Sequence, residues 1–222
     1  MSIRERVRAI FKELPSGVTL VAATKTRTVE EIQEAIEAGV KVIGENYVQE
    51  AAKKQMVLGR GVKWHCIGHL QTNKAEQAVR LFDLIQTLDS WKLAEELNKR
   101  AFKKGLILPV LVEVNSGREP QKSGVFPEDV LIFVEKLSRL SNLSVQGLMT
   151  MGPLTEKPEE VRPFFRLTKD IFTEIERKQI PGVKMQFLSM GMSDTWRIAV
   201  QEGANMVRIG TAIFGPRTTG QP

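Results

Sequence analysis

Lys25 ends the first apolar, β-branched run of the chain, which covers residues 18–25. An ammonium group at the end of a buried strand is costly unless it is paired, solvated or used chemically. One interpretation is that the flexible stem of Lys25 packs against apolar groups while its ammonium reaches water. The other is a nucleophilic amine of the kind that forms Schiff bases with carbonyl compounds. The residue alone leaves both interpretations open.

Two segments rich in glycine and hydroxyl groups lie near the C-terminus, Ser189-Met190-Gly191-Met192-Ser193 and Arg208-Ile209-Gly210-Thr211. Glycine lets the backbone approach a phosphate closely, hydroxyls and amides donate hydrogen bonds to it, and a helix expected to start at Ser193 offers its positive end. Ordinary tight turns are the alternative, because the pattern by itself is weak. The position of the two segments in the fold has to decide between these readings.

Arg208 precedes Gly210 by two residues, so its side chain should point to the same end of the fold as the glycine segments. One possibility is an ion pair with a carboxylate such as Glu113. Another is a cofactor contact, because an arginine is one of the partners that proteins use for the ring nitrogen of pyridoxal phosphate.

Other chemistries have little support in the sequence. His65, Cys66 and His69 suggest a metal site only weakly, because His65 and Cys66 would face opposite sides of a strand and no second cluster supplies further ligands. No Ser-His-Asp ordering or Walker glycine loop is present. The basic runs Lys53-Lys54 and 99–104 fall on helical segments, which predicts a solvated outer face rather than a nucleic-acid stripe.

The elements that must position these residues repeat in order: a short apolar run, a polar or glycine turn, then a helical pattern. Eight runs are expected to be strands, and helical stretches, among them the six named below, are expected between them. Thr28, Ser90 and Ser193 are the expected capping residues of three helices. The expected strands are residues 18–25, 40–46, 63–70, 84–89, 106–115, 145–151, 185–191 and 206–215, and the helices are 28–38, 73–82, 90–104, 127–140, 158–179 and 193–202.

The strands are almost wholly apolar, which is expected when helices cover both faces of a parallel sheet. Alternating strands and helices leave an open doubly wound sheet or a barrel, and the count of eight favours a single-domain α/β barrel of the TIM (β/α)8 type over residues 1–222. In such a barrel function lies at the C-terminal ends of the strands, and the loops after strands seven and eight often hold a phosphate. This position favours phosphate binding over ordinary turns.

An extra amphipathic helix is expected at the N-terminus, where apolar residues at 3, 7, 10, 11 and 14 share one face. Only residues 216–220 follow the last expected strand before the final Gln-Pro, so the helix that should come after it is missing or very short. We expect the N-terminal helix to cover the resulting gap.

Composition sets the broad class. Cys66 is the only cysteine, so disulfides are excluded and a reducing compartment is expected. No apolar run approaches the roughly 20 residues of a membrane span, and no signal peptide is evident. We therefore expect a cytoplasmic protein that does not associate with a membrane. The net charge of +6 raises nucleic acid as a partner, but aromatic residues are only 6% of the chain, too few for a base-stacking platform. We assign the charge to the outer helices and to one anionic ligand.

Over essentially its whole length the sequence resembles the YggS/PROSC family of pyridoxal phosphate homeostasis proteins. Six motifs in the family's order carry the resemblance, which makes it far more specific than any one pattern. They are Val21-Ala22-Ala23-Thr24-Lys25, Ile43-Gly44-Glu45-Asn46-Tyr47-Val48-Gln49-Glu50, Trp64-His65-Cys66-Ile67-Gly68-His69-Leu70-Gln71-Thr72-Asn73-Lys74, Gly147-Leu148-Met149-Thr150-Met151, Leu188-Ser189-Met190-Gly191-Met192-Ser193-Asp194 and Val207-Arg208-Ile209-Gly210-Thr211-Ala212-Ile213-Phe214-Gly215.

The resemblance implies a barrel of the fold type III that binds pyridoxal phosphate, related to the barrel half of alanine racemase and of bacterial-type ornithine decarboxylases. It implies that Lys25 carries the cofactor as a Schiff base and that Arg208 faces the ring nitrogen. Asn46 and Met149 match positions near the ring. The residues that match the phosphate-binding loops are Ser189, Gly191, Ser193, Gly210 and Thr211.

From this resemblance we expect a protein that carries pyridoxal phosphate reversibly and acts in vitamin B6 and amino-acid homeostasis, with no catalytic residues. A racemase of this type needs a second acid/base from an added domain, and 222 residues leave no room for one. The alternative is a weak amino-acid racemase or decarboxylase, in which Tyr47, the only tyrosine, would take part. We expect a monomer, with cofactor-dependent client enzymes or a regulatory protein left open as further partners.

Overall fold

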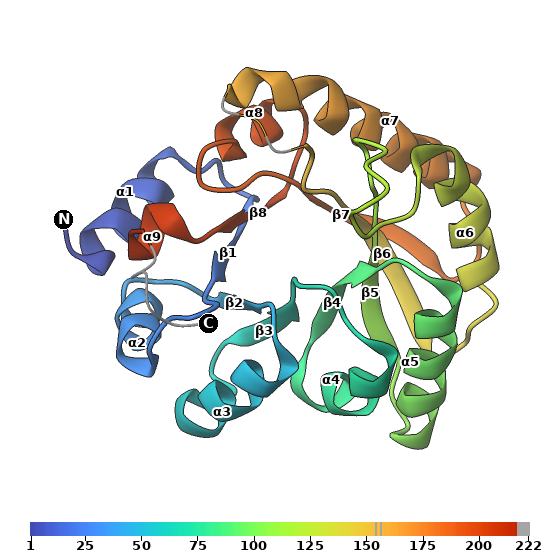
Figure 1. Ribbon diagram of the computed structural model, residues 1–222, viewed down its shortest axis with the longest axis horizontal. Helices are drawn as coiled ribbons and strands as arrows, with labels where there is room; N and C mark the ends of the chain where they lie inside the picture. The colour runs from blue at the N-terminus through green and yellow to red at the C-terminus, as the bar shows by residue number, and fades with distance from the viewer. Residues whose placement is uncertain (154, 156, 217–222) are drawn as a thin grey trace.

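Within residues 1–153, 155 and 157–216, which the computed structural model describes, eight parallel strands close into a barrel in chain order (Figure 1). The last strand returns to the first, with Val21 opposite Arg208. All eight expected strands are confirmed, mostly shortened at their ends. Their bounds are β1 Thr19–Ala23, β2 Val42–Glu45, β3 Lys63–Cys66, β4 Leu84–Leu88, β5 Leu108–Glu113, β6 Leu143–Met149, β7 Val183–Ser189 and β8 Met206–Ile209.

Helices surround the barrel on the outside (Figure 1). At the start of α2, the Thr28 hydroxyl accepts from the Glu31 backbone, and the Glu31 carboxylate accepts from the Thr28 backbone, which confirms the expected capping box. The bounds are α1 Ile3–Glu13, α2 Val29–Glu37, α3 Val48–Leu58, α4 Ala75–Leu81, α5 Trp91–Lys103, α6 Val130–Leu137, α7 Arg162–Lys178, α8 Trp196–Gln201 and α9 Thr211–Phe214, with 3-10 turns η1 Thr72–Lys74, η2 Pro127–Asp129 and η3 Pro158–Val161.

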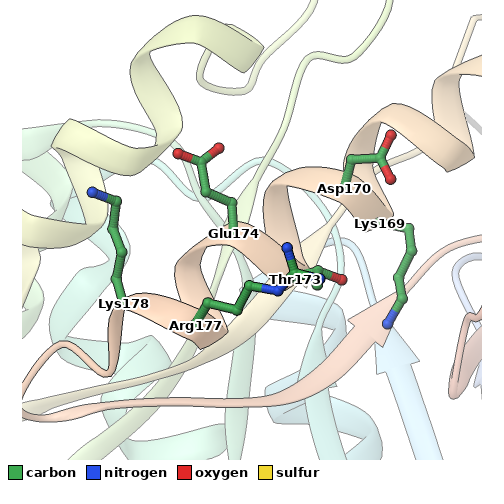
Figure 2. Close-up of a pocket in the computed structure, with 6 residues that line it drawn as sticks. All are labelled: Lys169, Asp170, Thr173, Glu174, Arg177 and Lys178. Carbon is green, nitrogen blue, oxygen red and sulfur yellow. The ribbon is translucent and has the colours of Figure 1, made fainter.

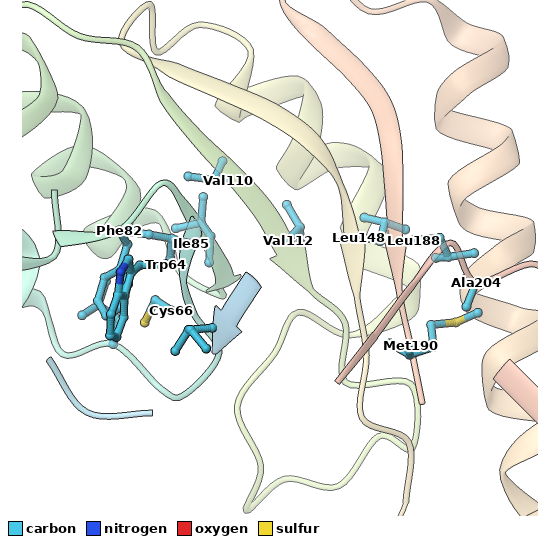
Figure 3. Packing of buried hydrophobic residues seen from close by; sticks show 14 of the residues in the cluster. Trp64, Cys66, Phe82, Ile85, Val110, Val112, Leu148, Leu188, Met190 and Ala204 are labelled. Carbon is cyan, nitrogen blue, oxygen red and sulfur yellow. The ribbon is translucent and has the colours of Figure 1, made fainter. Parts of the chain in front are cut away.

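Side-chain alternation along the strands divides the core into two layers. Trp64 and Cys66 of β3 point outward into the layer between barrel and helices, where they pack beside Phe82 and Ile85 (Figure 3). The smaller layer fills the barrel interior and consists of Val21, Val42, Leu84, Leu111, Met149 and Met206. The interior is therefore packed, and the buried polar side chains His65 and Gln86 lie beside this apolar layer, with Gln86 in contact with Met206.

The gap after β8 is closed by two helices. The short α9 follows β8, and α1 lies beside it (Figure 1). Arg27, at the start of the α2 segment, donates to the carbonyl oxygens of Phe214 and Gly215 and so ties the end of α9 to the β1 side. The expected short last helix and covering N-terminal helix are both confirmed, whereas residues 217–222 of the expected tail lie outside the described residues.

Four expected helix starts are wrong. The helices expected from Pro127 and Pro158 begin at Val130 and Arg162, after the 3-10 turns η2 and η3. The helix expected from Ser193 begins at Trp196, because the hydroxyls of Ser193 and Thr195 are used in the loop: Ser193 accepts from the Ala212 backbone, and Thr195 accepts from the Met192 backbone. The helix expected from Asn73 begins at Ala75, after the 3-10 turn η1. Ser90 stands at the N-cap of α5 without a side-chain capping bond.

Among the described residues, no helix is both long enough and apolar enough to cross a membrane.

Candidate functional site

The residues singled out from the sequence lie at one end of the barrel. Asn46 follows β2 directly, Met149 and Ser189 are the last residues of β6 and β7, and Lys25 comes two residues after β1. Parallel strands place all their C-terminal ends at the same mouth. The remaining predicted residues lie in the loop after β7, in β8 and at the start of α9: Gly191, Ser193, Arg208, Gly210 and Thr211.

Two hydrogen bonds tie the loop after β7 to β8 and to the start of α9. The Arg208 N–H donates to the Gly191 carbonyl oxygen over 3.0 Å, and the Ala212 N–H donates to the Ser193 hydroxyl over 3.1 Å. Gly191 is buried with φ +87°, and a Cβ there would lie 2.6 Å from the Ala199 Cβ, so only glycine fits this turn. The segments after β7 and at the end of β8 therefore form a compact arrangement. The N-terminus of α8, which was expected at Ser193 as a phosphate contact, lies at Trp196 instead.

Arg208 is buried, with 4% of its surface exposed, and its guanidinium is held by hydrogen bonds inside the mouth. It donates to the Ser189 hydroxyl over 2.7 Å and to the Thr150 carbonyl oxygen over 2.9 Å. Burial lowers the pKa of Arg208 to about 10, against the favourable charge of Glu113, so the guanidinium is still charged at neutral pH. Among the described residues Arg208 forms no ion pair with Glu113, although the charge of Glu113 acts on it. The cofactor contact of Arg208 stays a prediction.

Ser189 has a different environment from that of an exposed phosphate ligand. Its side chain is fully buried, accepts from Arg208 and donates to the Gln86 Oε1 over 2.7 Å. Its contact with a phosphate stays a prediction, and its two hydrogen bonds make Ser189 a support for Arg208.

Gln86 and His65 continue this chain of hydrogen bonds across the barrel interior, and sequence reasoning missed Gln86. The Gln86 amide nitrogen lies 3.0 Å from His65 Nδ1, so His65 accepts there and carries its proton on Nε2. Burial lowers the pKa of His65 to about 4, which keeps the ring neutral. The available signal was alternation: Gln86 stands two residues after the inward-facing Leu84 on β4.

Cys66 faces the opposite side of β3 from His65, as expected. Burial raises the pKa of its thiol to about 12, so it is a packed, unreactive side chain. Within the described ranges, no group of three or more His, Cys, Asp or Glu side chains is arranged to hold a metal ion.

Glu113, the last residue of β5, is a buried carboxylate of this mouth. Its Oε2 has no hydrogen-bond partner among the described residues. Burial first, and the charge of Asp89 second, raise the pKa of Glu113 to about 7, while Arg208 acts in the opposite direction. This carboxyl group therefore titrates near neutrality.

Asn46 and Met149 differ in exposure. Met149 is fully buried in the interior core, whereas Asn46 is half-buried, with its backbone against Gly68. Tyr47 is 58% exposed and lines, with Asn46 and His69, a surface cavity of about 430 Å³.

A groove of about 460 Å³ lies away from the mouth, on α7 (Figure 2). The side chains that line it, including Lys169, Asp170 and Arg177, belong to the outer surface of that helix. It contains none of the residues that the sequence singled out.

The expectation that Lys53-Lys54 form a solvated face is wrong for Lys54. Lys53 is exposed, but Lys54 is only 7% exposed and makes its hydrogen bonds next to Lys25. Its spacing gave a signal, because Val48, Ala51 and Lys54 share the buried face of α3.

Comparison with known proteins places this barrel in a family. Residues 1–218 match the family model of the alanine racemase N-terminal domain. A pyridoxal phosphate homeostasis protein of Aquifex aeolicus is 45% identical over 97% of this chain and 95% of that protein. The structure of PipY from Synechococcus elongatus with pyridoxal phosphate bound has a TM-score of 0.89 at 38% identity, covering 96% of this chain and 100% of PipY.

An alanine racemase of Clostridium difficile has a TM-score of 0.81 at 16% identity, with 98% of this chain and 60% of that chain covered, which shows a shared fold. The relatives at 45% and 38% identity, which cover nearly the whole chain, show more than a shared fold: they show the family. The chain therefore belongs to the alanine racemase N-terminal domain family and, within it, to the pyridoxal phosphate homeostasis proteins.

Proposed function

We propose that this protein binds pyridoxal phosphate at the barrel mouth, holds it reversibly as a Schiff base on Lys25, and acts in vitamin B6 and amino-acid homeostasis. The observation that carries the proposal is the convergence of Lys25, the two glycine loops and the buried Arg208 at one end of the barrel. The PipY structure with pyridoxal phosphate bound and the relatives named pyridoxal phosphate homeostasis proteins support it.

The donor set fits a phosphorylated aldehyde. A lysine amine, two adjoining loops with glycine and hydroxyl groups, and a buried guanidinium lie at the same strand ends. Pyridoxal phosphate, when bound, supplies an aldehyde carbon to which an amine adds with release of one water molecule. Lys25 provides the nitrogen of that C=N bond, and Gly191, Ser193, Gly210 and Thr211 would hold the phosphate.

The same residues explain why carriage suits this site better than carbanion chemistry. A charged guanidinium at the ring nitrogen disfavours a proton there, so the ring becomes a weaker electron sink. Arg208 is held in place by Ser189 and Thr150 and stays charged at neutral pH. Of the two histidines, His65 is buried and neutral, while His69 lies within 3.3 Å of an Asp89 carboxylate oxygen.

The second candidate is a weak amino-acid racemase or decarboxylase. It is favoured by Tyr47, whose exposed phenol lines a cavity together with Asn46. Incubation with alanine in deuterated water tests it: exchange of the α-proton that Tyr47→Phe abolishes would establish this candidate, and no exchange would leave the carrier proposal in place.

The proposal is tested by colour and its reversal. Purified protein offered pyridoxal phosphate should develop the absorbance of a Schiff base and lose it reversibly with hydroxylamine. Lys25→Ala should stay colourless, whereas Lys53→Ala, which removes an exposed lysine of α3, should behave like the parent protein. A parent protein that stays colourless would contradict the proposal.

A further inference from the structure

A buried ammonium group lies beside the backbone that carries Lys25. Lys54 of α3 is 7% exposed, and its Nζ donates three hydrogen bonds: to the Thr24 carbonyl oxygen at 2.7 Å, to Glu45 Oε1 at 2.6 Å and to Glu50 Oε2 at 3.1 Å. An ammonium group has three donors, so its capacity is filled. A charge this deeply buried is tolerated only when it is paired and hydrogen-bonded.

The two carboxylates extend the contact to both sides of Lys25. Glu45 Oε1, fully buried, also accepts from the Thr24 hydroxyl at 2.5 Å. Glu50 Oε2 also accepts from the Thr26 N–H at 3.1 Å. The peptide carbonyl before Lys25 and the peptide N–H after it are therefore bonded to one ion cluster, which we call the Lys54 clamp: Glu45, Glu50 and Lys54.

The backbone at this point adopts a conformation that needs such support. Thr26 has φ +63°, in the left-handed region that β-branched residues rarely adopt. Such a residue persists only where its surroundings hold it, and these conformations gather at binding and catalytic sites. Two hydrogen bonds hold this turn: the Thr26 N–H donates to Glu50 Oε2, and the Arg27 N–H donates to the Thr24 carbonyl oxygen at 3.0 Å.

We propose that Lys54 is a positioning residue for Lys25. The proposal rests on the proposed function, in which Lys25 adds to an aldehyde. By fixing the peptide groups before and after Lys25, the Lys54 clamp fixes the direction in which the Lys25 side chain leaves the backbone. Reaction between an amine and a bound aldehyde depends on such placement. Displacement of the amine by about 1 Å lowers its effective concentration at the aldehyde on the order of a hundredfold.

The first test compares two ligands that differ only at the reacting carbon. Pyridoxal phosphate has an aldehyde, and pyridoxine 5′-phosphate has an alcohol in its place, so only the first bonds to Lys25. Lys54→Met should weaken pyridoxal phosphate binding about ten- to a hundredfold, while pyridoxine 5′-phosphate affinity changes less than about threefold. Lys53→Met, one residue away and exposed, is the matched control. Equal losses for both ligands, or no loss for either, would overturn the proposal.

The second test needs no cofactor. Hydrogen exchange of the Thr26 amide, followed by NMR in the ligand-free protein, should be slow in the parent protein and at least tenfold faster in Lys54→Met. Glu50→Ala provides a variant that removes the Thr26 acceptor at a part-exposed position and leaves the Lys54–Glu45 contact, should Lys54→Met fail to fold. It should show the same faster exchange and the same selective loss of pyridoxal phosphate affinity. Unchanged exchange together with unchanged ligand selectivity would overturn the proposal.

The two proposals fail in different ways. If Lys25 forms no Schiff base, the parent protein and Lys25→Ala bind the two ligands alike, which contradicts the proposed function. If Lys54 has no positioning role, the parent protein still distinguishes the two ligands and Lys54→Met distinguishes them equally well.

Discussion

Replacing Glu113 with glutamine should change how stability depends on pH. The carboxyl group of Glu113 is buried, its Oε2 has no partner among the described residues, and its pKa rises from 4.5 to about 7 because of burial and the charge of Asp89. The folded protein thus binds a proton that the unfolded chain has already lost between pH 4.5 and 7. Stability from this group is present at low pH and is lost as the pH rises through that window.

The shift sets the size of the effect. A rise from 4.5 to about 7 corresponds to about 3 kcal/mol of folding free energy at pH 8, at 1.4 kcal/mol per pKa unit. Glutamine has the same shape and no charge, so Glu113→Gln should be more stable than the parent by up to about 3 kcal/mol at pH 8 and nearly equal to it at pH 4.5.

Urea unfolding of both proteins at several pH values between 4.5 and 8 measures this difference. His65 contributes the opposite slope, because its pKa falls from 6.5 to about 4 and its contribution grows as the pH rises through that range. That contribution is common to both proteins and cancels in the comparison. Parallel stability curves for the two proteins would show that the Glu113 carboxyl does not have a raised pKa in the folded protein.

Three further predictions follow from close contacts and burial. Gly147→Ala should destabilise the protein by about 3 kcal/mol or more in urea unfolding, because a Cβ at φ +143° would lie 1.8 Å from the Phe187 carbonyl oxygen. The control Gly17→Ala, at φ +88° in open space, should cost only about 1 kcal/mol. Similar costs for the two variants would contradict the backbone clash. Gly191→Ala should lower the affinity for pyridoxal phosphate and for pyridoxine 5′-phosphate about tenfold each in equilibrium titrations, because its Cβ would lie 2.6 Å from the Ala199 Cβ and force the loop after β7 to move. Binding of unphosphorylated pyridoxal should not change. Equal losses for all three ligands would show that the loop does not act on the phosphate. Cys66 should react with a thiol reagent only on unfolding, since it is buried and its pKa is raised to about 12, and rapid labelling of the native protein would contradict this packing.

The barrel could be predicted because each local signal agreed with the whole. Apolar runs of strand length alternated with helical patterns, and residues that end strands had to meet at one mouth. Lys25 and Arg208 were found this way because a charged side chain in or after an apolar strand stands out in the sequence.

The Lys54 clamp could not be predicted with the same ease. Lys54 follows Lys53 in a helix, and a charge pair on a helix normally indicates a solvated face. Its burial depends on Glu45, which comes from the end of β2 and meets it only in the folded chain. The start of α8 was misjudged for a related reason, since the Ser193 hydroxyl accepts a bond from the loop after β8 rather than capping its own helix.

The central claim is that Lys25 is the residue that holds pyridoxal phosphate, and the most direct measurement is to trap the bond and locate it. The protein is incubated with pyridoxal phosphate, reduced with borohydride, digested and analysed by mass spectrometry. We expect one dominant adduct, on the peptide that contains Lys25, and its loss in Lys25→Ala but not in Lys53→Ala. An adduct spread over several lysines, or one that persists at the same level in Lys25→Ala, would contradict it.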